Sequence, residues 1–329
     1  MQVAEDEGKK MKTLAEDERQ SQREMTPPSN WWLPMVDPPP GVPTIYLADY
    51  EYDTRLGWGS IGYVDRVRHK PTGRLYALKA VRIHDHQRCQ NRVREYMALA
   101  PTLEYRSIVK CHGVQTERGY SRLLYDLMTS PLSGFQTHDM EILSHIADNI
   151  LFGLQYLRKK NIVFKFLSPS NIFYDDADMA FKIGDVGAPK DLLFDVDCQP
   201  VPNVEAERYV APELLSYTVR LSVEGVENWD VWSLGMCLLE FYLGKFPIDY
   251  DKRKDTKGLS LPFFMAGMPN PPRAPPEAWP PFRHFIELCL QRSPADRASV
   301  DQLLSHEFVL TFDFEHQEGK RKNEGDRLD

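Results

Sequence analysis

The spacing of apolar residues divides the chain into a strand-rich part and a helical part. The run from Leu75 to Val81 alternates like a β-strand, whereas residues 89–99 have helical spacing. Between Asp139 and Lys160, apolar residues recur every three or four positions and Asp139 is placed as an N-cap, so a helix is predicted. Residues 229–246 are apolar on all sides, which is typical of a buried central helix.

Two closing helices are predicted further on, over residues 282–290 and 300–308. Residues 252–281 are basic and then rich in proline, which predicts a surface insert. The succession of strands and then helices predicts an α+β protein with two lobes. A smaller β-rich N-lobe is expected over residues 50–128 and a larger helical C-lobe over residues 129–310.

The ends of the chain have a different composition. Residues 1–25 carry charges of both signs and almost no large apolar residue, so a disordered tail is expected, and residues 311–329 are expected to form a second charged tail. Residues 26–49 form a proline-rich extension, in which proline favours extended backbone. The adjacent Trp31 and Trp32 either pack against the domain or anchor a partner.

Composition excludes several classes of protein. The net charge of −8 argues against a general nucleic-acid binder, because phosphate contacts need clustered Lys and Arg. The five cysteines are scattered and form no Cys-x-x-Cys pair, so neither a disulfide framework nor a zinc site is indicated. The sequence shows neither a membrane-length apolar run nor a signal-peptide pattern, and the expected location is the cytosol or the nucleus.

Glycines mark a candidate phosphate-binding loop. Three of them have Gly-x-Gly-x-x-Gly spacing and precede a valine: Gly57, Gly59, Gly62 and Val64. Glycine suits such a loop because the backbone must approach phosphates closely, although this spacing alone also fits a hairpin turn. Lys79 follows Ala77 in the strand-like run, and Glu95 lies 16 residues later in the helix-like run.

Further motifs follow in the same order as in protein kinases. They are Asp185-Val186-Gly187, Ala211-Pro212-Glu213 and Asp230-Val231-Trp232-Ser233-Leu234-Gly235. Together with the glycine loop and Lys79, these motifs make residues 50–310 resemble a protein kinase domain. The segments most similar to MAP kinase kinases, particularly the plant type, are residues 66–70, 75–79, 109–113, 154–157 and 230–247.

The resemblance implies a role for each matching residue. Lys79 would hold the α- and β-phosphates of ATP and pair with Glu95. Asn171 and Asp185 would bind Mg²⁺. The other implied nucleotide-binding residues are Gly57, Gly59, Gly62, Val64, Ala77, Asp126, Met128 and Phe173. The implied structural residues are Glu213, Asp230 and Arg297, and those of an apolar spine between the lobes are Leu99, Phe164 and Val186. Alternatively, the charged residues are retained for shape, without a nucleotide.

The catalytic loop departs from the kinase pattern at the residues that carry its chemistry. Phe166 replaces the proton-accepting Asp, Ser168 replaces the phosphate-steadying Lys, and Ala206 replaces a Thr that ties both to the peptide platform. Pro169 and Asn171 keep the pattern. Phenylalanine cannot accept a proton, and general acid–base catalysis contributes about 10²–10⁴-fold to a rate. The changes therefore indicate impaired catalysis.

The activation segment also lacks its usual chemistry. From Asp185 to Glu213 there is no Ser and no Thr, and Tyr209 carries the only side-chain hydroxyl. Since MAP kinase kinases are switched on by phosphorylation of such residues, the resemblance implies that this switch is missing. The acidic residues of the segment either form a solvated loop or mimic phosphates with Lys165 as their partner. They are Asp191, Asp195, Asp197, Glu205 and Glu207.

These observations predict a pseudokinase that resembles a MAP kinase kinase, binds ATP and Mg²⁺, and acts as a scaffold or allosteric regulator. Its expected partners are MAP kinases or other kinases of the cascade. One alternative is an active or weakly active kinase with a displaced acid, although the nearest acids are expected on the next hairpin: Asp175, Asp176 and Asp178. Another is a nucleotide-free interaction module, which is favoured if Trp58 or Phe166 fills the cleft. Trp58 could stack over a closed pocket or pack on the helix that carries Glu95.

Overall fold

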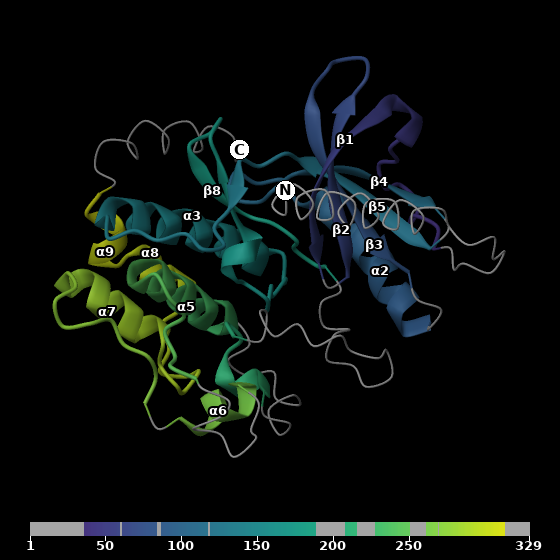
Figure 1. Cartoon of the computed structure of the whole chain (residues 1–329). Coiled ribbons are helices and arrows are strands. Elements are labelled where there is room, and N and C mark those ends of the chain that lie inside the picture. The colour runs from purple at the N-terminus through teal and green to yellow at the C-terminus, as the bar shows by residue number, and fades with distance from the viewer. Residues whose placement is uncertain are drawn as a thin grey trace, which may run out of the picture.

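The computed structural model describes residues 36–59, 61–83, 87–117, 119–188, 208–215, 228–250, 261–268 and 270–312. They form a β-sheet lobe that carries one long helix and a mostly helical second lobe, which confirms the predicted α+β bilobal architecture (Figure 1). The predictions for the N-terminal tail, for all but the first two residues of the C-terminal tail, and for Trp31, Trp32, Ala206 and the acidic residues of the activation segment fall outside these ranges.

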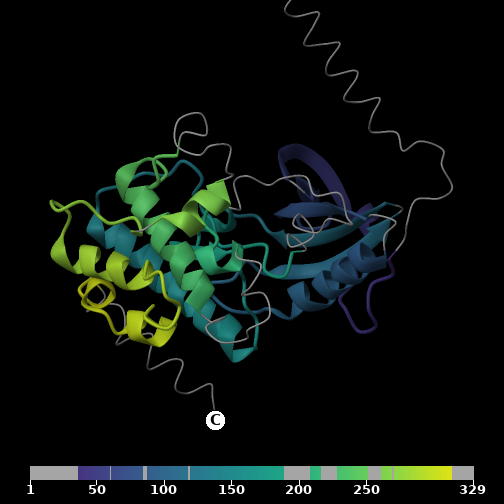
Figure 2. The ribbon, with the colours of Figure 1, turned by 90° about the horizontal axis from the view of Figure 1, so that it is seen from below.

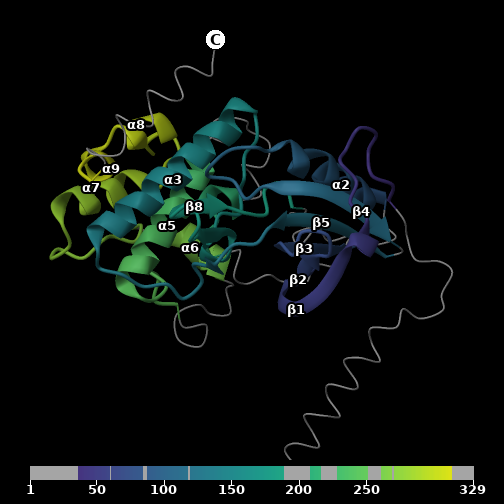
Figure 3. The same ribbon diagram turned by 90° about the horizontal axis from the view of Figure 1, so that it is seen from above.

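An antiparallel sheet builds the smaller lobe. Its strands are β1 (Tyr50–Gly59), β2 (Gly62–His69), β3 (Leu75–Arg82), β4 (Cys111–Glu117) and β5 (Tyr120–Asp126), in the spatial order β1-β2-β3-β5-β4. The strand predicted over residues 75–81 is β3, which pairs with β2 on one side and with β5 on the other. Helix α2 (Gln87–Leu99) lies beside β4 and β5 (Figure 3) and begins two residues before its predicted start at position 89. Short 3₁₀ turns, η1 (Leu47–Asp49) and η2 (Ala100–Thr102), precede β1 and follow α2.

The proline-rich segment before β1 packs onto the free edge of β4. The amide of Ile45 donates to the carbonyl of Val114 (3.0 Å), and the amide of Val114 donates to the carbonyl of Pro43 (2.8 Å). Val36 is 0% exposed, because its side chain enters the apolar cluster that contains Val93 and other residues of α2. This segment therefore contributes to the core of the small lobe.

Helices packed around a central apolar one form the larger lobe (Figure 2). They are α3 (Met140–Lys159), α5 (Trp229–Leu243), α6 (Leu261–Gly267), α7 (Pro280–Cys289), α8 (Val300–Leu304) and α9 (Glu307–Leu310). The predicted N-cap of α3 is confirmed, since the Asp139 carboxylate accepts from the amides of Glu141 and Ile142. The larger lobe also contains a small sheet of β6 (Ser130–Pro131), β7 (Ile172–Asp175) and β8 (Ala180–Ile183), and the 3₁₀ turns η3 (Pro169–Asn171) and η6 (Pro212–Leu215).

Three details of the helix predictions were wrong. Helix α5 ends at Leu243, because Gly244 takes a left-handed conformation (φ 66°) and its amide caps the carbonyl of Glu240. The single closing helix predicted over 300–308 is two helices, since His306 is extended and its side chain accepts from the amide of Phe308. The predicted surface insert contains helix α6, whose Leu261 and Met265 are buried in the core. No helix within the described ranges is both long and apolar enough to cross a membrane.

Candidate functional site

The β1–β2 hairpin carries the candidate glycine loop and pairs with β3. A side chain at Gly62 would place its Cβ 1.8 Å from the carbonyl oxygen of Ala80 on β3, so only glycine fits there. Trp58 pairs with Tyr63 across the hairpin, on the face opposite Val64, because successive strand residues point to opposite faces. The Arg55 guanidinium lies over the Trp58 and Tyr63 rings, at 4.3 and 4.0 Å from their centroids. Trp58 is 73% exposed, so both packings expected for it were wrong.

The expected adenine pocket is apolar. Ala77, Met128 and Phe173 pack against one cluster of buried residues. Phe173 also touches Gly184, where a Cβ would lie 2.6 Å from its ring. The Asp126 carboxylate binds His112 and Arg74, each at 2.8 Å. Although burial opposes its ionisation, the hydrogen bond from His112 and the charge of Arg74 lower the pKa of Asp126. Because the carboxylate is engaged in this way, the backbone of Asp126 is the part of this residue that could contact a nucleotide.

Lys79 of β3 is buried, and its ammonium group does not pair with the expected carboxylate of Glu95. Its Nζ lies 2.5 Å from Oδ1 of Asp185. The predicted Lys79–Glu95 pair was wrong: the Glu95 side chain is 61% exposed and forms an ion pair with Arg92 on its own helix.

Tyr96 takes the inward position of α2 that Glu95 was expected to occupy. Tyr96 is completely buried, and its hydroxyl lies 2.6 Å from the hydroxyl of Tyr125, at the end of β5. Burial, together with the negative charge of Asp185, raises the pKa of Tyr96 well above its ordinary value. Sequence analysis missed both tyrosines. A signal was present, since the buried residues Cys89, Val93, Tyr96, Met97 and Ala100 follow helical spacing that excludes Glu95.

The catalytic loop is folded and anchored from below by Asp230. The amides of Phe164 and Lys165 donate to its two carboxylate oxygens, at 2.9 and 2.7 Å. These bonds hold Lys165 in a left-handed conformation (φ 71°), which is uncommon for a residue with a side chain. Burial of Asp230 raises its pKa to about 6, in spite of the two backbone hydrogen bonds that favour its charged form.

Neutral groups occupy the positions expected to carry the chemistry. The Asn171 side chain donates to the carbonyl of Phe166 (2.7 Å) and to the Ser168 hydroxyl (3.2 Å). The Ser168 hydroxyl also contacts that of Ser170 (2.9 Å), and the Phe166 ring is half-buried. Neither phenylalanine nor serine ionises near neutral pH. The loop thus keeps its shape without a proton-accepting carboxylate at Phe166 or a cation at Ser168.

The nearby acids considered as substitutes are engaged elsewhere. Asp175 and Asp178 both bind the ammonium group of Lys182, at 2.6 and 2.5 Å, on the β7–β8 hairpin. The amide of Asp176 donates to the Thr129 hydroxyl, and its side chain is exposed. The hairpin position predicted for these residues is therefore confirmed.

Apolar contacts connect the lobes behind this loop. Phe164 and Val186 are buried in the large-lobe cluster, and Leu99 of α2 packs against it. A Cβ at Gly187 would lie 2.8 Å from Cδ2 of Leu99, so this glycine allows α2 to approach closely.

Tyr209 cannot serve as an accessible phosphorylation site in this fold. It is buried, its hydroxyl donates to the Glu240 carboxylate (2.7 Å), and its carbonyl accepts from the Ser233 hydroxyl (2.8 Å). Burial and the proximity of Cys237 raise its pKa above the ordinary value, with a contribution from Glu240.

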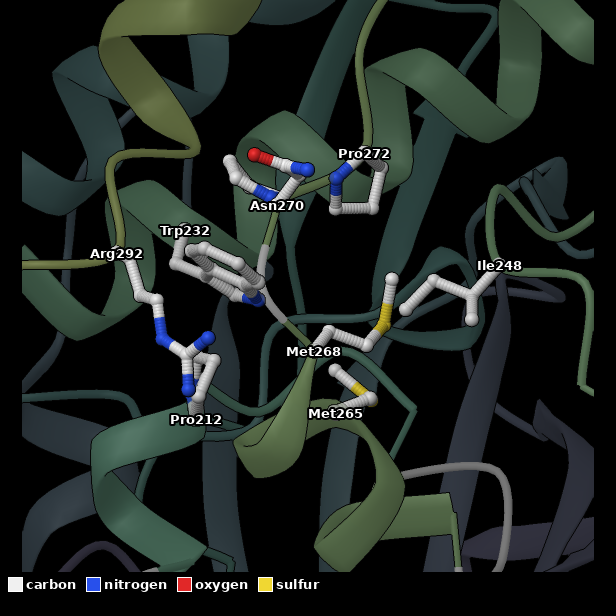
Figure 4. A pocket seen from close by; sticks show the side chains of 9 residues that line it. Pro212, Trp232, Ile248, Met265, Met268, Asn270, Pro272 and Arg292 are labelled. Carbon is white, nitrogen blue, oxygen red and sulfur yellow. The ribbon is translucent and has the colours of Figure 1, made fainter. Parts of the chain in front are cut away.

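A buried ion pair braces the large lobe. The Arg297 guanidinium donates to both Glu213 oxygens (2.7 and 3.1 Å) and lies over the Trp232 ring, 5.2 Å from its centroid. Trp232 borders a small pocket with Met268 and Pro212, between α5, α6 and η6 (Figure 4). Its buried indole N–H has no hydrogen-bond partner among the residues that the structure describes.

Comparison with known proteins identifies the family. The protein kinase domain family matches residues 50–309, so the chain belongs to the protein kinases. It is 30% identical over 277 residues to mitogen-activated protein kinase kinase 9 of Arabidopsis thaliana. The aligned region covers 82% of this chain and 87% of the relative. Mitogen-activated protein kinase kinase 1 of the same plant is 29% identical over 293 residues, 84% of this chain and 79% of the relative. Serine/threonine-protein kinase pakE of Dictyostelium discoideum is 28% identical over 79% of this chain and 27% of its own length. The chain carries a MAP kinase kinase-like protein kinase domain.

Proposed function

We propose that this protein is a pseudokinase that acts through binding, as a scaffold or allosteric regulator of MAP kinases or other kinases of the cascade. One observation carries the proposal: Asn171 and Asp230 hold the catalytic loop in an ordered conformation, whereas Phe166 and Ser168 offer no group that can accept a proton. The order of the loop argues that it was retained for its shape. We place the protein in the cytosol or the nucleus, where such kinases would meet it.

The described residues fit a magnesium nucleotide in their donor chemistry. Lys79 supplies a cation beneath the glycine loop, and Asp185 and Asn171 supply the oxygen atoms that Mg²⁺ prefers. Bound Mg²⁺ would neutralise phosphate charge. The chain would contribute the apolar pocket of Ala77 and Phe173, which orients the base and excludes water. ATP would then act as a structural ligand rather than as a substrate.

The test is transfer of the γ-phosphate from magnesium-ATP to a catalytically inactive MAP kinase and to the protein itself, with Lys79→Met as the blank. Cooperative unfolding shows that the sample is folded. From such protein we expect no phosphate transfer above the blank. Transfer above the blank would overturn the proposal and indicate a working kinase. If ATP also fails to raise the melting temperature, the protein binds partners without a nucleotide.

A further inference from the structure

Helix α2 buries Tyr96 in the apolar core of the small lobe, while the neighbouring Glu95 faces solvent. Consecutive residues of an α-helix are about 100° apart around its axis, so the two side chains point in different directions. The 0% exposure of Tyr96 and the 61% exposure of the Glu95 side chain show which of the two is inside.

Tyr125 is the partner that meets Tyr96 inside the lobe. It pairs with Ala77 across β3 and β5, two positions along from the Lys79–Leu123 pair. Residues two positions apart on a strand share a face, so Tyr125 and Lys79 lie on the same face of the sheet. The hydroxyl–hydroxyl distance of 2.6 Å joins α2 to this face next to the lysine.

The far side of α2 is fixed as well. The Thr116 hydroxyl of β4 donates to the carbonyl of Val36 (2.8 Å) and lies 3.6 Å from the sulfur of Met97, and Val36 and Met97 share one buried cluster, so the segment before β1 packs against the helix. Turning α2 to bring Glu95 inward would draw Tyr96 from Tyr125 and leave two buried hydroxyls without their mutual hydrogen bond. Burying polar groups unpaired is unfavourable, which opposes this rotation.

We propose that the Tyr96–Tyr125 hydroxyl pair is a latch: it holds Glu95 away from Lys79, so that Lys79 remains paired with Asp185. The latch keeps the cleft in a state with reduced nucleotide affinity, because the Lys79 ammonium is already neutralised by a carboxylate that Mg²⁺ requires. This regulatory role rests on the nucleotide binding proposed above. The effect of the latch on the position of helix α2 is independent of nucleotide binding.

Phenylalanine substitutions test the latch with little change of shape. In Tyr125→Phe and Tyr96→Phe, the ring remains and one hydroxyl is lost. A water-soluble carbodiimide, which couples a lysine to a carboxylate in contact with it, is applied to the full chain without nucleotide, and the products are mapped by mass spectrometry. Wild type and the control Tyr52→Phe, on the exposed surface of β1, should yield a Lys79–Asp185 product. Both latch variants should also yield Lys79–Glu95. If neither does so while melting cooperatively, the latch is overturned.

Nucleotide binding provides the second measurement. Each latch variant should bind magnesium-ADP about two- to tenfold more tightly than wild type, as expected from the loss of one hydrogen bond that opposes the binding-competent state. The gain should disappear when Glu95→Gln is added, because the neutral amide cannot pair with Lys79. A gain that persists with Glu95→Gln would contradict the latch. If the Lys79–Glu95 product forms but no variant binds nucleotide, the latch stands and the nucleotide part of the proposed function fails.

Discussion

The ammonium group of Lys79 lies 2.5 Å from the carboxylate of Asp185, and this ion pair connects strand β3 to the segment that follows β8. Two residues that the kinase pattern assigns to phosphate and magnesium therefore neutralise each other where the two lobes meet. A nucleotide that enters must replace this contact by contacts of its own.

Lys79→Met should abolish stabilisation by ATP, because the substitution removes the cation expected to meet the phosphates. At a concentration about 100-fold above its dissociation constant, a ligand stabilises the folded state by about 2.7 kcal/mol, which thermal unfolding detects readily. Lys110→Met is the matched control, since the ion pair of Lys110 with Glu104 is exposed to solvent. Equal stabilisation of Lys79→Met and wild type would contradict this placement of the nucleotide.

Restoring the missing proton acceptor and the missing lysine should restore some phosphoryl transfer. Phe166→Asp combined with Ser168→Lys places both groups on a loop that is already ordered, and a general base contributes about 10²–10⁴-fold. Transfer to an inactive MAP kinase measures the gain, with Phe166→Asn combined with Ser168→Lys as the control that lacks the base. Activity of wild type equal to that of the restored variant would show that the proton-accepting carboxylate is dispensable. Continued inactivity would implicate Ala206 or the outward position of Glu95.

Burial of Asp230 should make stability depend on pH. Its pKa rises from 3.8 to about 6 in the folded protein, so the folded state binds a proton more readily than the unfolded state between these values. The free energy of unfolding should therefore fall by about 3 kcal/mol in total as the pH rises through this window. Denaturant unfolding of wild type and Asp230→Asn isolates the effect, because the asparagine does not ionise. Asp176→Asn, at an exposed site, should follow wild type. A constant difference between wild type and Asp230→Asn across the window would contradict the prediction.

Removing one partner of the Arg297–Glu213 pair should destabilise the large lobe strongly. The Arg297 side chain is fully buried, and Arg297→Met would leave the Glu213 carboxylate without its bidentate partner, at a cost of about 3–5 kcal/mol. Arg158→Met is the control, because the Arg158–Asp301 pair is solvent-accessible and contributes about 1 kcal/mol or less. Unfolding in denaturant measures both. Similar losses of unfolding free energy in the two variants would show that the buried pair stabilises the protein no more than the exposed one.

Much of the fold and part of the site could be predicted from local patterns. The Asp139 cap and apolar spacing of α3, the strand β3 and the hairpin position of Asp175 and Asp178 all depend on contacts within short segments or between adjacent strands. The end of α5 was missed because a left-handed glycine looks like any other glycine in the sequence. The identities of Phe166 and Ser168 also needed no structure.

The sequence by itself determined the kinase architecture and the loss of the proton-accepting Asp and the phosphate-steadying Lys, because both follow from residue types and their order. Only the tertiary structure decided which carboxylate Lys79 meets. That choice depends on the rotation of α2, and the rotation is set by long-range contacts of Tyr96 with Tyr125 and of Met97 with Thr116. Motif spacing placed Glu95 beside Lys79, but packing of the helix onto the sheet turned it toward solvent.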